Sequence, residues 1–110
     1  MNVLNDFVFF DSATSTGESN ILHNPNRGSI LTLEVQGSGT FSLTLQGLVN
    51  KKIANPSYST LAAIDISDYS VPDAITKSGI YCFGVDGVND IKAVISSISG
   101  SVTVFGRIGE

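Results

Sequence analysis

The feature that most restricts this chain is a strict alternation of apolar and polar residues over its second half and part of its first. In residues 40–46, Phe41, Leu43 and Leu45 alternate with threonine, serine and glutamine, and residues 90–96 repeat the pattern. A period of two places alternate side chains on opposite faces of a β-strand, whereas an amphipathic helix requires a period of about 3.6. The alternation therefore predicts an all-β protein.

Glycine, serine and aspartate separate the alternating runs, as is typical of turns between strands. The strongest strand signals lie at residues 29–36, 40–46, 79–85, 90–96 and 102–108. We expect the first two to form an antiparallel hairpin through Gly37-Ser38-Gly39. The last three are expected to follow one another through turns at Asp86-Gly87 and Ser99-Gly100. Weaker signals predict further strands at residues 7–10, 21–22 and 58–67, and a polar loop at residues 13–19.

Strands of this length and spacing favour a sandwich or barrel over βαβ units. Longer links at residues 47–57 and 68–77 suit crossovers between two sheets. We therefore predict an all-β fold, an antiparallel β-sandwich of seven to eight strands with a jelly-roll-like arrangement. No repeat or linker divides the chain, so residues 1–110 are predicted to form a single domain.

The charge balance argues against a nucleic-acid partner. The chain has 6 Lys and Arg against 10 Asp and Glu, for a net charge of −4, whereas nucleic-acid affinity comes largely from basic side chains at phosphates. The adjacent pair Lys51-Lys52 is best explained as a solvated hairpin tip. No stretch approaches the ~18 apolar residues of a membrane span. The N-terminus has no basic region or long apolar run, so we expect no signal peptide and synthesis in the cytoplasm.

Residues with catalytic potential are scattered. Cys82 lies in an apolar strand and is expected to be a small buried side chain, while His23 lies in a polar loop far away in sequence. One cysteine also excludes an intrachain disulfide. Serine is abundant but no Gly-x-Ser-x-Gly motif is present, and the acidic residues fall mostly at predicted turns. We therefore expect no catalytic residues and a protein that is not an enzyme.

Metal and cofactor signals are equally sparse. Asp86, Asn89 and Asp90 place three oxygen-bearing side chains within five residues, but an EF-hand also needs flanking helices and a distal glutamate. The chain has no Cys/His cluster for zinc and no glycine-rich phosphate loop. We expect neither a metal nor a cofactor.

Aromatic residues supply the candidate contact sites. Tyr58 and Tyr69 flank the long links and are candidates for contact with a ligand or partner, including a glycan. Phe7, Phe9 and Phe10 belong to a short apolar strand near the N-terminus. That strand is expected either to join the core or to pair with another subunit, because an exposed edge strand is otherwise an aggregation hazard.

Several segments resemble small virion proteins of tailed bacteriophages and of prophages of Gram-positive bacteria. The resemblance covers residues 29–108. Its motifs are Ile75-Thr76-Lys77-Ser78-Gly79-Ile80-Tyr81, then Val85-Asp86-Gly87-Val88-Asn89-Asp90-Ile91-Lys92, then a glycine turn and Val102-Thr103-Val104. Tyr58 stands where such proteins often carry a tryptophan.

The resemblance implies a jelly-roll-like sandwich that decorates the phage head or sits on the tail or baseplate. It implies a virion location, synthesis in the bacterial host, capsid or tail proteins as partners, and a homo-oligomer, with a trimer favoured. We therefore predict a non-enzymatic virion accessory protein that binds the capsid or tail lattice. The alternative is a small carbohydrate-binding module that recognises a cell-surface glycan, and an enzyme is a distant third.

Overall fold

The computed structural model describes residues 5–24, 29–49 and 57–109. These residues form eight strands of one antiparallel sheet, and no helix of the described segments could cross a membrane. The expected all-β, antiparallel fold is thus confirmed. The strands are β1 (Asn5–Ala13), β2 (Gly17–Glu18), β3 (Leu22–His23), β4 (Ile30–Leu48), β5 (Ser59–Thr60), β6 (Ile64–Asp65), β7 (Gly79–Gly84) and β8 (Asp90–Gly109).

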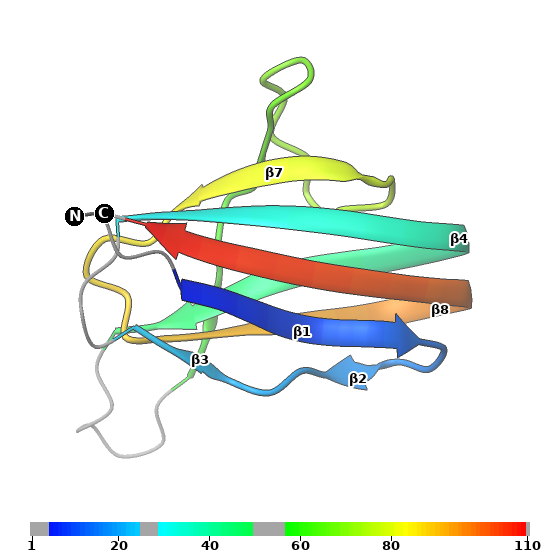
Figure 1. The fold of residues 1–110 in the computed structure, drawn as a ribbon, viewed down its shortest axis with the longest axis horizontal. Helices are drawn as coiled ribbons and strands as arrows, with labels where there is room; N and C mark the ends of the chain where they lie inside the picture. Colours follow the sequence, from blue (N-terminus) through cyan, green and yellow to red (C-terminus); the bar gives the residue numbers. More distant parts are fainter. Residues whose placement is uncertain (1–4, 25–28, 50–56, 110) are drawn as a thin grey trace.

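A folded ribbon of β4 and β8 organises the molecule. The two strands pair along their whole lengths, and both double back at the right-hand end of Figure 1. The fold line lies where Gly39 faces Gly100, with φ angles of 75° and 117° that side chains rarely adopt. A Cβ at either glycine would overlap the backbone of the opposite strand. Glycine is therefore required on both strands for the ribbon to fold.

The fold line divides the sheet into two layers. The front layer has the strand order β6, β7, first half of β4, second half of β8, β1. The back layer has β5, the second half of β4, the first half of β8, and then β2 and β3. Inward-facing side chains from both layers form one core, which includes Leu31, Leu33, Val35, Leu43, Leu45, Tyr81, Phe83, Ile91, Ile95, Val102 and Val104.

The predicted hairpin is wrong. Residues 31–35 pair with β7 and with the second half of β8, and residues 40–48 pair with the first half of β8 and with β5. The glycines at 37 and 39 redirect one continuous strand into the other layer. Ser99-Gly100 does the same for β8, so the last three strands are not consecutive neighbours. A left-handed glycine suits a tight turn or a fold in a ribbon equally well, so it does not identify the pairing partner.

Several shorter segments also differ from expectation. Residues 58–67 form two short strands, β5 in the back layer and β6 in the front, and the expected loop at residues 13–19 contains β2. The link at residues 68–77 is not the expected crossover, because it joins β6 to β7 within the front layer and only touches the back layer where Ile75 pairs with Leu43. The chain changes layer between β5 and β6. The link after β4 instead joins two paired strands of the back layer. Its residues 50–56, including Lys51-Lys52, lie outside the described segments.

The alternating residues face as predicted, and the turn at Asp86-Gly87 is present. Leu31, Leu33 and Val35 are 0–1% exposed while the residues between them face outward. The Val88 amide donates to the Val85 carbonyl at 3.0 Å, and Gly87 has a φ of 83°. Cys82 departs from expectation: it is half-buried and lies between the inward-facing Tyr81 and Phe83, on the outward face of β7.

Candidate functional site

A groove of about 780 Å³ crosses the outer face of the front layer. Its walls come from β1, β8, β4 and β7, and they combine apolar and charged side chains. Thr32 is shorter than the Glu34 and Arg107 side chains beside it on this face, and together they line the hollow. We call this hollow the front groove.

An apolar row runs across the front groove at right angles to the strands. Val8 pairs with Phe105, Phe105 with Glu34, and Glu34 with Ile80. The exposed fractions of Val8, Phe105 and Ile80 are 48%, 40% and 39%. Adjacent cross-strand side chains on one face lie about 5 Å apart, so Val8 and Phe105 are direct neighbours, while Glu34 lies between Phe105 and Ile80. Exposed apolar side chains gathered on one face make this row a candidate interaction surface.

Two charged positions beside the row are already paired. The Arg107 guanidinium donates to both carboxylate oxygens of Asp6, with Nε–Oδ1 at 2.6 Å and Nη2–Oδ2 at 3.3 Å. Mainly through this hydrogen bond, Arg107 holds the pKa of Asp6 below its ordinary value. Glu34, by contrast, makes no hydrogen bond or ion pair through its side chain with any residue that the structure describes. The front groove therefore carries one unbalanced carboxylate.

A rigid loop next to the front groove presents Tyr69. The connection from β6 to β7 rises above β7 in Figure 1. Asp65 Oδ1 accepts hydrogen bonds from the Ser67 amide and hydroxyl at 3.0 and 2.7 Å, and the Tyr69 amide donates to the Asp65 carbonyl. Tyr69 has a φ of 61°, which is strained for an aromatic residue, yet it is 80% exposed. Strain of this kind recurs at binding sites.

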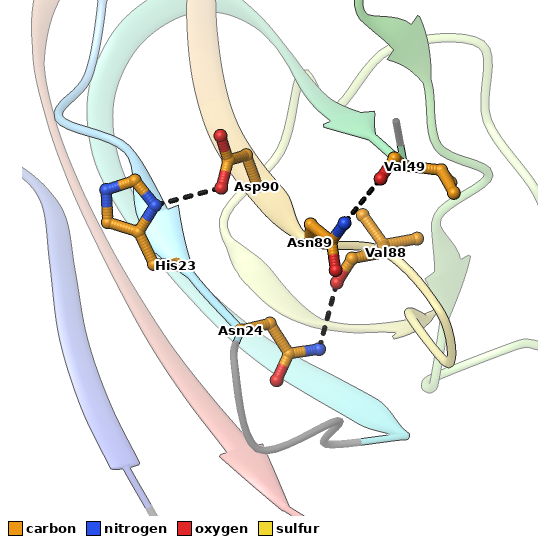
Figure 2. Close-up of polar contacts among 6 residues, drawn as sticks. All are labelled: His23, Asn24, Val49, Val88, Asn89 and Asp90. Atoms are coloured by element: carbon orange, nitrogen blue, oxygen red, sulfur yellow. Dashed lines mark hydrogen bonds and ion pairs between the residues drawn. The ribbon is translucent and has the colours of Figure 1, made fainter. Parts of the chain in front are cut away.

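A polar cluster ties strand ends together at the other side of the molecule, where β3, the end of β4 and the start of β8 meet (Figure 2). His23 Nδ1 lies 2.9 Å from Asp90 Oδ1, Asn24 Nδ2 donates to the Val88 carbonyl at 3.1 Å, and Asn89 Nδ2 donates to the Val49 carbonyl. Asn24 and Asp90 are each 5% exposed. Buried polar groups need such partners, so the cluster has a structural role.

The cluster contains the histidine and an aspartate that a Ser-His-Asp site would use. No serine or cysteine of the described segments hydrogen-bonds to His23. Those segments also contain no group of three or more His, Cys, Asp or Glu side chains that could hold a metal ion. Asn89 and Asp90, which could have contributed to a calcium site, hold strand ends together here.

The predicted contact residues lie in different places. Phe9 is 4% exposed and belongs to the core, while Phe7 and Phe10 are half-buried against it. The Lys92 ammonium lies over the ring of Tyr58, with Nζ 4.2 Å from the ring centroid, on the outer face of the back layer. Tyr69 lies beside the front layer, so the structure does not join the two tyrosines into one site.

Comparison with known proteins identifies the relatives of this chain. The profile of one protein family, described as XepA, matches residues 3–108. The chain belongs to the XepA family. No protein with a curated description matches it in sequence.

Two solved structures share this XepA-family fold. The SPBc2 prophage-derived protein YomS has 19% sequence identity and a TM-score of 0.87, covering 100% of this chain and 96% of YomS. The PBSX exported protein XepA has 20% identity and a TM-score of 0.86, covering 99% of this chain but 38% of XepA. The expected relationship to phage and prophage proteins is therefore confirmed.

Sequence reasoning missed the residues that make the front groove in this XepA-family protein. A signal was available for Phe105, since it is a large aromatic residue between the inward-facing positions 104 and 106. Val8 and Ile80 likewise lie next to inward-facing aromatic residues. Only the pairing of four strands shows that these outward positions meet, so no local pattern could have assembled the site.

Proposed function

We propose that this XepA-family protein is a structural accessory protein of the phage particle that binds the capsid or tail lattice through the front groove. The observation that supports this most is the exposed apolar row of Val8, Phe105 and Ile80 on the outer face of a rigid sheet. Such a row exposes apolar surface to water in the free protein, and covering this surface with a partner is favourable in free energy. The relationship to prophage proteins supports the phage particle as the place where the protein binds.

The outer face of the front layer is a better docking surface than the edge of β1. Although β1 is the edge strand of that layer, its register with β8 shifts after Val8 and again after Phe10, and Ser12 has a φ of 55°. Bulges of this kind discourage strand addition. Docking through side chains therefore fits this edge better than extension of the sheet.

The test introduces Phe105→Ser into the phage or prophage that encodes the protein and measures the amount of protein in purified particles. Val94→Ser is the matched control, because Val94 is an outward-facing residue on the other half of β8. We expect the first variant to fold but to be lost from particles, and the second to be incorporated normally. Equal incorporation of both variants would contradict the proposal. Separating heads from tails then identifies which lattice is bound.

Self-association belongs to the same proposal, with a trimer as the expected state. Light scattering of the purified protein measures it directly, and Phe105→Ser tests whether copies meet through the front groove. If the wild-type protein is monomeric at all concentrations, self-association is ruled out and only lattice binding remains to be tested.

A glycan-binding role is the second candidate, and the 80% exposure of Tyr69 on its rigid loop is the observation that favours it. A glycan array probed with wild type, Tyr69→Ala and Tyr58→Ala separates the two functions. Binding that Tyr69→Ala abolishes and Tyr58→Ala leaves unchanged would support glycan recognition by the Tyr69 loop, and no binding by the wild type would remove this candidate.

A further inference from the structure

We propose that the front groove selects a protein segment that presents a lysine or arginine between apolar side chains, and that Glu34 recognises the cation. This inference rests on the proposed function, because it assigns a chemistry to the partner that docks there. It follows from the position of one carboxylate within the apolar row.

The position of Glu34 sets the pattern of the partner. It lies between Phe105 and Ile80, directly opposite both in the strand register. A segment lying along this row would meet an apolar side chain, then a carboxylate, then an apolar side chain. The complementary segment therefore has a basic residue flanked by aliphatic or aromatic residues. Phe105 can also contact the cation through its ring face.

The charges of the front groove disfavour an anionic partner and a purely apolar partner. An anionic segment would face Glu34 without help from Arg107, because Arg107 is held by Asp6 at 2.6 Å. A purely apolar segment would cover the Glu34 carboxylate without providing a partner, and a buried unpaired charge is costly. A cation removes that cost through a charge-assisted hydrogen bond, which is strengthened where apolar neighbours exclude water.

The test measures binding of pentylguanidinium and of its neutral analogue pentylurea by following the methyl NMR signals of Val8 and Ile80. Wild type is compared with Glu34→Gln, which keeps the size of the side chain but removes its charge. Asp11→Asn is the matched control, because Asp11 is an exposed carboxylate on β1 that does not line the front groove. The same NMR spectra also show whether each variant is folded.

We expect Glu34→Gln to weaken pentylguanidinium binding about fivefold, as for a partly exposed ion pair, while Asp11→Asn leaves it unchanged. Pentylurea should bind more weakly than pentylguanidinium and should not respond to Glu34→Gln. Added salt should weaken only the binding of the cation. Equal binding of both compounds, or no effect of Glu34→Gln, would overturn the inference.

Particle incorporation separates this inference from the proposed function. If Glu34→Gln is incorporated like wild type while Phe105→Ser is lost, lattice docking stands and the cation selectivity falls. If the wild-type protein is absent from particles while Glu34 binds the guanidinium as expected, the proposed function falls and the chemistry of the groove stands.

Discussion

The outer faces of the two layers differ although the same two strands supply both. On the back layer, the outward-facing Lys92 is only 13% exposed, because its ammonium pairs with Glu18 at 3.0 Å and covers the Tyr58 ring. On the front layer, the outward-facing residues include Phe105 and Glu34, whose carboxylate pairs with none of the residues that the structure describes. Around Lys92 the side chains of the back face thus contact one another, whereas the front face leaves the row of Val8, Phe105 and Ile80 exposed. The contrast between the two faces therefore comes from their outward-facing residues and not from the strand pairing.

The largest expected effect comes from removing the fold line that separates the two faces. Gly39→Ala and Gly100→Ala each place a Cβ against the backbone of the opposite strand, at φ angles that alanine disfavours. We expect each to lower the free energy of unfolding by about 3 kcal/mol or more. Urea denaturation measures this. Gly84→Ala is the control, because nothing lies within 4 Å of its added Cβ; a similar loss there would contradict the role of the fold line.

The next prediction contrasts the two sides of the front layer. Leu33 is 0% exposed and faces the core, so Leu33→Ala should cost about 2–5 kcal/mol in stability. Phe105, on the strand that pairs with it, faces outward, and Phe105→Ser should cost no more than about 1 kcal/mol. The midpoints of denaturant unfolding measure the two losses of stability, provided that both variants unfold with the same slope. A large loss for Phe105→Ser would mean that the apolar row stabilises the protein itself and is not reserved for a partner.

A smaller effect is expected on the back face. Lys92→Met keeps the apolar stem of the side chain but removes the cation that contacts Glu18 and Tyr58. The expected loss is about 1 kcal/mol, because a cation–π contact and a partly shielded ion pair disappear together. Thermal unfolding at low and high salt measures it. If stability is unchanged, the back face is not held by these contacts and the contrast between the faces weakens.

The smallest effect concerns the rim of the front groove. Arg107 lowers the pKa of Asp6 below 3.8. A carboxyl with a depressed pKa in the folded protein stabilises it above its unfolded pKa, and this contribution is lost as pH falls through the folded pKa. Wild type should therefore exceed Asp6→Asn in stability near neutral pH, and the difference should shrink below pH 3.8. Urea midpoints from pH 6 to pH 2.5 test this, and a difference independent of pH would contradict it.

Local patterns in the sequence were sufficient to predict the main strands and which of their residues face inward. Burial of Leu43, Ile91 and Val104 depends on a period of two, which a single segment displays. The same holds for the turn at Asp86-Gly87, because an aspartate and a glycine suffice to make it. Properties that depend on a few neighbouring residues could thus be predicted.

Pairing could not be predicted in the same way. The glycines at 37 and 39 are compatible with a hairpin and with a folded ribbon, and the choice depends on β8, which lies far along the chain. The front groove depends on four strands at once. Tyr69 was recognised as a candidate contact, but its positive φ belongs to a local turn in which its amide donates to the Asp65 carbonyl, and the tyrosine alone does not identify such a turn.

The ribbon also determines the order in which the molecule can fold. The sequence separation between paired residues is smallest where Leu48 meets Asp90 and grows steadily to the pair Ile30 and Gly109. Because closing a longer loop costs more entropy, pairing of β4 with β8 should begin at the Leu48 end and proceed pair by pair through the fold line to the Ile30 end. Contacts this distant in sequence predict slow folding. During synthesis only β5 and β7 can pair with β4 before β8 leaves the ribosome, so both layers stay incomplete until β8 has been made.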